Sequence, residues 1–174
     1  LEQNGLLDSY LRQQRLPTFA KNYRQFAADA AGKNMDHVRF LLALAEQEVN
    51  QREHNMIQRR VKAARFPVLK ELANFDFSLV PTLNKAEILD LTRGEYLQKR
   101  KSIILVGNPG LGKTHLATGI ALAACRQKRK VRFWTTPSLV NELQQAQDEN
   151  RLHRFITQAL KLDLVLLDEL GYIP

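Results

Sequence analysis

The chain has 174 residues, a formal net charge of +8 and 44% hydrophobic residues, which suits one globular domain or a domain with an appendage. Its one cysteine excludes a disulfide within the chain, and no Cys/His spacing predicts a zinc site. No stretch predicts a membrane span or a secretory signal, so a cytoplasmic location is expected. The positive charge favours a polyanionic partner such as nucleic acid, but equally fits a merely basic soluble protein.

Residues 1–70 are predicted to form an all-α domain. Apolar residues recur at helical spacing from residue 3 to about residue 65. Pro17 is expected to stop or restart a helix, and Gly32 suits a helix C-terminus. This domain would serve DNA or partner binding, or oligomerisation.

The end of this helical region is strongly basic. Residues 52–70 hold six basic side chains and one acidic one, Glu53. Such a run can be a solvated helix face or a stripe that contacts phosphates, and the lack of alternating acidic residues favours phosphates. The candidate DNA contacts here are Arg52, Arg59, Arg60, Lys62 and Arg65.

Residues 71–100 are predicted to connect this domain to the next. The prolines and aromatic residues between residues 66 and 84 indicate an irregular segment that packs on the following domain. Asn84 can cap a helix over residues 85–100.

Residues 101–174 predict alternating strands and helices. Apolar runs at residues 102–107, 131–136 and 163–169 are typical of buried parallel strands. A helix is expected from Lys113 to about Gln127, and two more lie between the second and third strands, the first opened by Pro137. The pattern predicts an α/β fold with a parallel sheet.

The loop after the first predicted strand, "GNPGLGKT", matches G-x-x-x-x-G-K-[ST] completely. Glycines allow successive N–H groups to line a concavity for phosphate, and the following helix adds its positive end. Lys113 is expected to reach the β- and γ-phosphates of ATP, and Thr114 to supply a hydroxyl ligand to Mg²⁺. The nucleotide-binding candidates are Gly107, Asn108, Pro109, Gly110, Leu111, Gly112, Lys113, Thr114 and His115.

Two carboxylates end the third predicted strand, in "LVLLDEL". Asp168 is expected to hold the magnesium, largely through water, and Glu169 to polarise the attacking water. The alternative is a pair of acidic residues that merely ends a strand, which the complete phosphate loop upstream disfavours. An Asp-Glu pair favours ATP hydrolysis over a small-molecule kinase. The predicted catalytic residues are therefore Lys113, Asp168 and Glu169.

The combination "GKTHLA", "VRFWTTPSLVNEL" and "LLDELGYIP" resembles the IstB-like insertion-sequence ATP-binding proteins over essentially the whole chain. These are AAA+ ATPases related to DnaC-type helicase loaders. The resemblance implies a homo-oligomer that binds ATP between subunits, assembles on duplex DNA with little sequence preference, and presents that DNA to a transposase. It also makes a second basic segment a candidate DNA contact, although a solvated turn fits equally well: Lys128, Arg129, Lys130 and Arg132.

The resemblance further implies a longer protein. AAA+ proteins continue well beyond this point, with a strand between the phosphate-loop strand and the acidic strand, an arginine finger and a helical lid. An AAA+ core ending after the acidic strand is therefore expected to have a gap in its sheet, and to bind ATP weakly and hydrolyse it poorly.

A second function stays open. A helicase loader would use the same phosphate chemistry, but its N-terminal helices would present an apolar surface to a helicase. A helper that assembles on DNA would present a basic one. The basic run and the motifs favour the transposition helper.

Overall fold

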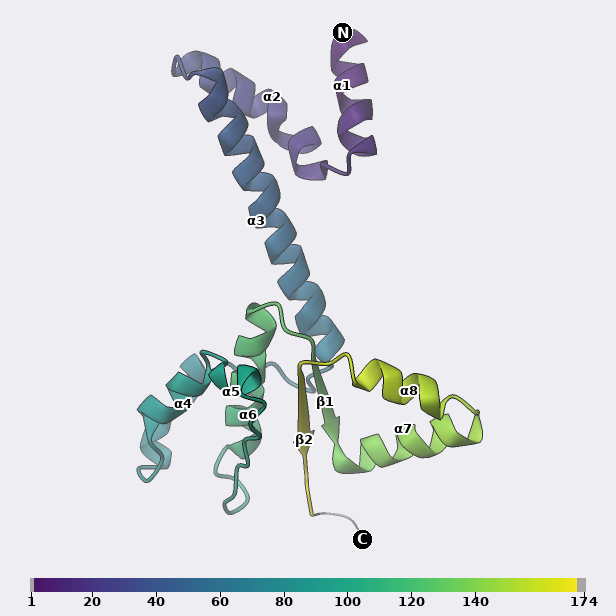
Figure 1. Ribbon diagram of the computed structural model, residues 1–174. Coiled ribbons are helices and arrows are strands. Elements are labelled where there is room, and N and C mark those ends of the chain that lie inside the picture. The colour runs from purple at the N-terminus through teal and green to yellow at the C-terminus, as the bar shows by residue number, and fades with distance from the viewer. Residues whose placement is uncertain (1, 172–174) are drawn as a thin grey trace. The chain divides into compact units, whose positions relative to one another are not determined.

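The computed structural model describes residues 2–171 (Figure 1). The chain divides into two compact units, Leu1–Met56 and Ile57–Pro174, whereas the sequence placed the first boundary at residue 70. The division falls inside α3 (His37–Ala64), because its last turns pack into the core of the second unit through Val61 and Ala64. No helix of the described residues is both long and apolar enough to cross a membrane.

The first unit contains α1 (Glu2–Gln13), α2 (Pro17–Gly32) and most of α3. Pro17 opens α2 and Gly32 ends it, as the sequence predicts, because proline tolerates the first helical turn and glycine tolerates the end of a helix. A small core of buried side chains joins the helices: Leu11, Tyr23 and Leu44.

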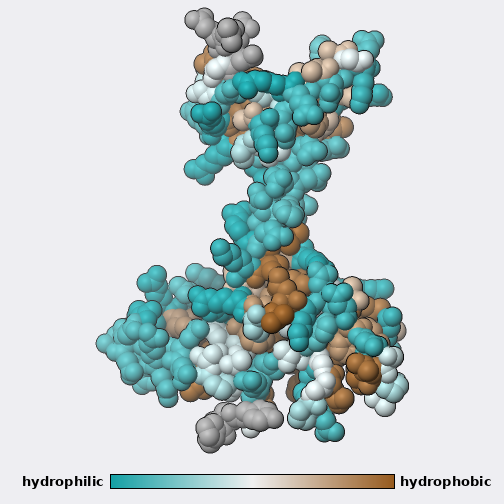
Figure 2. Space-filling view, turned by 180° about the vertical axis from the view of Figure 1, so that it is seen from behind, coloured by the Kyte–Doolittle hydropathy of each residue, from teal (hydrophilic) through white to brown (hydrophobic). Residues whose placement is uncertain are grey.

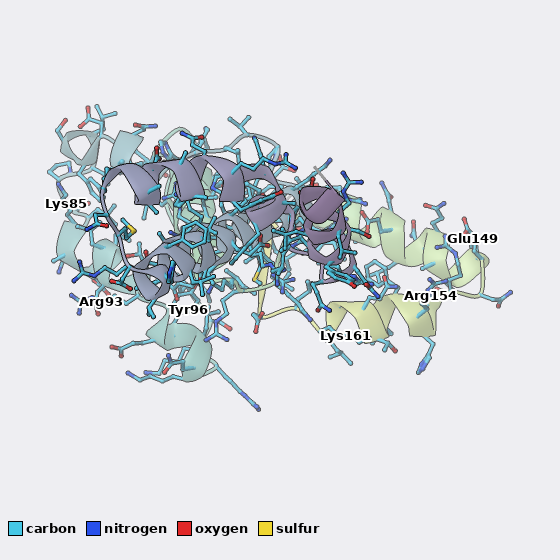
Figure 3. All side chains as sticks on the ribbon, turned by 90° about the horizontal axis from the view of Figure 1, so that it is seen from above. Lys85, Arg93, Tyr96, Glu149, Arg154 and Lys161 are labelled. Atoms are coloured by element: carbon cyan, nitrogen blue, oxygen red, sulfur yellow. The ribbon has the colours of Figure 1, made fainter. Side chains whose placement is uncertain are left out.

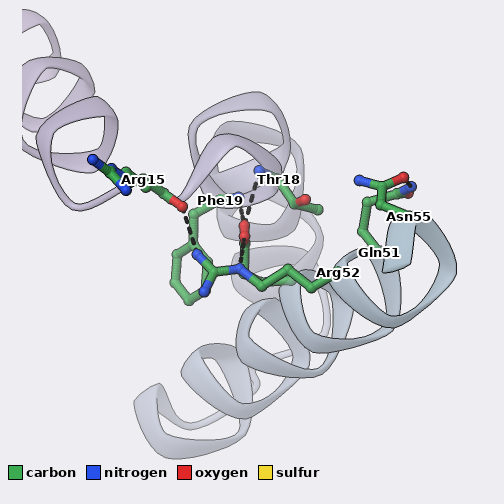
Figure 4. A network of polar contacts seen from close by, with 7 residues as sticks. Arg15, Thr18, Phe19, Gln51, Arg52 and Asn55 are labelled. Carbon is green, nitrogen blue, oxygen red and sulfur yellow. Dashed lines mark hydrogen bonds and ion pairs between the residues drawn. The ribbon is translucent and has the colours of Figure 1, made fainter. Parts of the chain in front are cut away.

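A buried carboxylate ties these helices together (Figure 4). Glu48 on α3 is only 4% exposed, and it accepts hydrogen bonds from the backbone N–H groups of Thr18 and Phe19 at 2.9 and 3.3 Å. It thereby caps the start of α2, where helix N–H groups lack partners. Arg52 donates to Glu48 at 2.7 Å and also to the carbonyl of Arg15. Burial alone would raise the pKa of Glu48, but these hydrogen bonds outweigh it and lower that pKa.

Replacing Glu48 with glutamine is expected to destabilise the first unit by about 1–3 kcal/mol, because a buried hydrogen-bonded charge is lost. Since folding lowers the pKa, this contribution is complete above the ordinary value of 4.5 and disappears as pH falls below it. Denaturant unfolding at pH 7 and at pH 3 measures the effect. The free energy of unfolding should fall between these pH values in the wild type, and fall less in Glu48→Gln. Glu46→Gln, at an exposed position of the same helix, is the control. Equal stability of the two variants at pH 7 would contradict this role.

The second unit contains a two-stranded parallel sheet, helices and short 3₁₀ turns. In chain order these are η1 (Leu72–Asn74), η2 (Phe77–Leu79), α4 (Lys85–Leu91), α5 (Glu95–Gln98), α6 (Lys113–Arg126), β1 (Val131–Thr135), α7 (Thr136–Asp148), α8 (Leu152–Ala159) and β2 (Leu164–Asp168). The residues between α3 and α4 form the irregular connector that the sequence predicts.

The sheet confirms the predicted α/β character. β1 and β2 run parallel, from Val131 opposite Leu164 to Thr135 opposite Asp168, with α7 and α8 connecting them. Figure 1 shows α6 on one side of the strands and the α7–α8 pair on the other. The core lies between α6 and the sheet, and its buried members include Cys125, Phe133 and Leu166.

The strand predicted at residues 102–107 is absent, and this prediction was wrong. An apolar run becomes a strand only when a neighbour completes its hydrogen-bonded ladder, and no described strand pairs with it. Ile104 and Val106 are 82% and 90% exposed. A cavity of about 880 Å³ is lined by residues 102–105 and by residues 163–170, which include β2.

The helix predicted over residues 85–100 is also corrected. It divides into α4 and α5, because Gly94 has a φ of 79°, outside helical geometry. The predicted cap is confirmed, since the Asn84 side chain accepts hydrogen bonds from the N–H groups of Ala86 and Glu87.

Charged and apolar side chains share the surface of the second unit. Figure 3 shows Lys85 and Arg93 on its α4–α5 side, and Glu149, Arg154 and Lys161 on its α7–α8 side. Hydrophobic side chains gather on one face of this unit in Figure 2.

Candidate functional site

The phosphate-loop residues lie between residue 106 and α6. Gly110 and Gly112 have φ values of 85° and 80°, which side chains other than glycine rarely adopt. Gly112 is the N-cap of α6 and provides no side-chain cap. The first N–H groups of α6 are therefore left for an external acceptor, and with the helix dipole they favour an anion.

Lys113 closes over its own loop. Its Nζ donates hydrogen bonds to the carbonyl oxygens of Gly107 and Asn108, at 2.8 and 2.9 Å. Neutral carbonyls are weaker partners for an ammonium than phosphate oxygens, so a bound phosphate can take these donors.

The loop and the acidic strand meet directly. The hydroxyl of Thr114 donates to Asp168 Oδ2 at 2.8 Å, although 54 positions separate the two residues. Thr136, at the start of α7, donates its hydroxyl to the carbonyl of Asp168 at 3.1 Å. Asp168 ends β2, so the site lies at the carboxyl end of a parallel strand, where α/β proteins bind ligands.

Glu169 follows in a turn. Its φ is 59°, a left-handed value uncommon outside glycine, and its N–H donates to Asp168 Oδ1 at 3.0 Å. Glu169 is exposed, next to Asp168 in the chain.

Two residues of the connector reach this site, although the sequence predicted only that the connector packs on the second domain. Phe75 packs edge-on against His115, with ring centroids 5.3 Å apart, and also lies against Gly112. The carbonyl oxygen of Glu71 lies 2.8 Å from Nε2 of His115. The imidazole of His115, a predicted nucleotide contact, therefore faces the connector.

The predicted DNA contacts fall into different surroundings. Arg52 belongs to the first unit, where it is bound to Glu48 and Arg15. Arg132 has a side chain only 15% exposed, paired with Glu142 at 3.5 Å and placed over the Trp134 ring. Burial and the neighbouring charge of Arg65 lower its pKa.

The remaining candidates lie in the second unit, on two segments: the end of α3 and the turn before β1. Arg132 of β1 links them. Arg59, Arg60 and Lys62 lie on the last turns of α3, and Arg65 follows it. Arg132 Nη1 lies 3.4 Å from the carbonyl oxygen of Ala63, which joins this end of α3 to β1. The second segment is the turn between α6 and β1, where Arg129 pairs with Asp163 at 3.7 Å: Lys128, Arg129 and Lys130.

Comparison with known proteins gives a consistent result. Residues 9–174 match the family of IstB-like ATP binding proteins. An ATP-binding protein named for insertion sequence IS232, from Bacillus thuringiensis subsp. berliner, is 34% identical over 168 residues, 97% of this chain and 67% of that protein. An insertion-sequence ATP-binding protein of Sinorhizobium fredii is 39% identical over 160 residues, covering 91% of this chain and 54% of that protein. One named for insertion sequence IS21, from Pseudomonas aeruginosa, is 31% identical over 97% of this chain and 63% of its own length.

The chain thus spans between about half and two thirds of the length of these relatives. The match extends over both units and includes the phosphate loop and the acidic strand. The chain belongs to the IstB-like ATP-binding proteins of insertion sequences.

Proposed function

We propose that this chain is part of an Mg²⁺-dependent ATPase that assembles on duplex DNA and helps a transposase engage its target. The observation that carries the ATPase part is the hydrogen bond between Thr114 and Asp168, which joins the phosphate loop to the acidic strand. Insertion-sequence relatives support the transposition part.

The site fits a magnesium ion. The Thr114 hydroxyl and the Asp168 carboxylate are oxygen donors 2.8 Å apart. Hydroxyl and carboxylate oxygens are donors that suit Mg²⁺, which keeps several of its water ligands in proteins. Thr114 and Asp168 would hold the ion, which would neutralise charge on the β- and γ-phosphates.

The chain's own groups have distinct roles. The N–H groups of the loop and of the start of α6 bind the phosphate oxygens, and Lys113 leaves its carbonyl partners to contact the β- and γ-phosphates. Glu169 orients a water towards the γ-phosphorus and accepts its proton as the oxygen–phosphorus bond forms and the ADP oxygen leaves. The loop glycines, Asn108, Pro109 and Leu111 shape the cradle.

DNA contact is proposed for the basic surface of the second unit. Arg59, Arg60, Lys62 and Arg65 at the end of α3, with residues 128–130, form two segments joined through Arg132 and Ala63. This surface lies near the start of β1, whereas Asp168 lies at the carboxyl end of β2. DNA and nucleotide would therefore occupy opposite ends of the sheet.

Replacing Arg59, Arg60 and Lys62 together with alanine is expected to weaken duplex binding regardless of sequence. The slope of log affinity against log salt concentration should decrease in magnitude by up to about 3, which is about one unit for each phosphate that is no longer neutralised. The control removes the same charge from the flanks that Figure 3 labels, by Arg93→Ala, Arg154→Ala and Lys161→Ala. An unchanged slope in the variant without Arg59, Arg60 and Lys62 would show that this end of α3 does not contact DNA.

One observation favours a second candidate, a helicase loader. The first unit exposes large apolar side chains, among them Val38 at 75% and Leu6 and Leu41 at about half. An apolar surface of this kind suits a protein partner. Assembly on DNA that depends on ATP separates the two candidates, because only the transposition helper requires it.

A further inference from the structure

The connector lies along one face of the helix that follows the phosphate loop. Its contacts are with the N-cap residue Gly112 and, within α6, with His115, Gly119 and Arg126. These positions are spaced by three, four and seven residues, which places them on one stripe of a helix. The connector runs in the opposite direction, with Glu71 paired to Arg126 and Phe75 placed against Gly112.

Glycines make this approach possible. An ideal Cβ at Gly119 would lie 2.5 Å from Leu72 Cγ, and one at Gly112 would lie 2.6 Å from Phe75 Cε2. Both distances are shorter than real contacts, so the Leu72 side chain and the Phe75 ring occupy space that a side chain at these positions would fill. The loop glycine at 112 therefore serves both the left-handed turn and the seat of Phe75.

Phe75 is itself held in place. Its ring meets Phe77 edge-on at 4.9 Å between centroids and His115 at 5.3 Å. Nε2 of His115 contacts the carbonyl oxygen of Glu71, which fixes the imidazole against the connector. The Phe75 ring, in contact with two other rings, therefore lies against Gly112, the residue just before Lys113.

We infer that Phe75 is a positioning residue for the phosphate loop, a role that rests on the proposed nucleotide site. The loop binds phosphate through N–H groups that must point inward together, and ordering them only on binding weakens affinity. Phe75 holds Gly112 in its left-handed conformation before the ligand arrives. The connector thus preorganises the site and acts through the loop backbone, without contact to the base.

The test measures by calorimetry the affinity of the whole chain for ADP and for inorganic pyrophosphate, each with Mg²⁺. Phe75→Ala is expected to weaken both ligands by about tenfold, since pyrophosphate uses the same loop and has no base. Phe75→Leu, which keeps apolar bulk on Gly112, should restore most of the affinity of both. The control is Phe66→Ala, which removes the ring packed on Phe133 in the core and should lower the thermal midpoint without changing either affinity while the chain is folded.

Three outcomes overturn the assignment. Affinities within twofold of the wild type would show that Phe75 does not position the loop. Loss of ADP affinity with pyrophosphate affinity unchanged would instead indicate a contact with the base. A wild-type chain that binds neither ligand would contradict the proposed nucleotide site as well.

Discussion

Replacing Lys113 with alanine is expected to lower ATP affinity by at least about a hundredfold, a loss of about 2.7 kcal/mol. The ammonium already lies in the loop, bound to the carbonyls of Gly107 and Asn108, and it supplies the charge-assisted hydrogen bonds that a phosphate needs. Calorimetric titration with ATP and Mg²⁺ measures the loss.

The matched control is Lys161→Ala, an exposed lysine on the α7–α8 side of the second unit (Figure 3). It should bind ATP as the wild type does, with the same thermal midpoint as Lys113→Ala. If Lys113→Ala bound ATP with an affinity within threefold of the wild type, Lys113 would not be part of the nucleotide site.

Replacing Glu169 with glutamine is expected to leave ATP affinity unchanged and to slow hydrolysis by about 10²–10⁴-fold. Glutamine keeps the size and polarity of the side chain but cannot accept a proton from water. The turn that holds residue 169 depends on its backbone N–H to Asp168, which the substitution preserves. Single-turnover hydrolysis with protein in excess over ATP resolves slow rates in both proteins.

Under the proposed function, in which hydrolysis releases the protein from DNA, the same variant is expected to prolong the ATP-bound complex on DNA. Glu149→Gln, at the C-terminal cap of α7, is the control and should hydrolyse ATP at the wild-type rate. A Glu169→Gln protein that hydrolyses ATP at the wild-type rate would contradict the role assigned to Glu169.

The phosphate loop and the acidic strand could be predicted from the sequence because short-range signals determine them. A loop with fixed glycine positions opens α6, and an apolar run ends at Asp168. Thr114 meets Asp168 because α6, which follows the loop, packs against the sheet.

The errors have physical causes. Residues 102–107 have a strand's composition, but strand formation depends on a partner elsewhere in the chain, which composition does not reveal. The helix breaks at Gly94, and a glycine inside a predicted helix is a known sign of a break. The helical periodicity on both sides of Gly94 nevertheless favoured one continuous helix.

Other features needed coordinates. Glu48 is one of several acidic residues on a long helix, and nothing local distinguishes the one that caps α2. Phe75 reaches Gly112 through packing between segments 37 positions apart, for which the glycines at 112 and 119 leave room. Arg132 belongs to a basic run, but its side chain is mostly covered and lies against Glu142 and Trp134.

The most direct test of the proposed function is the size of the complex on random duplex DNA, measured by light scattering with and without a non-hydrolysable ATP analogue. We expect large assemblies only when both DNA and nucleotide are present, and none with Lys113→Ala. Complexes of the same size with and without the analogue, or no assembly on DNA at all, would contradict an ATP-gated DNA-assembling machine and favour the helicase loader.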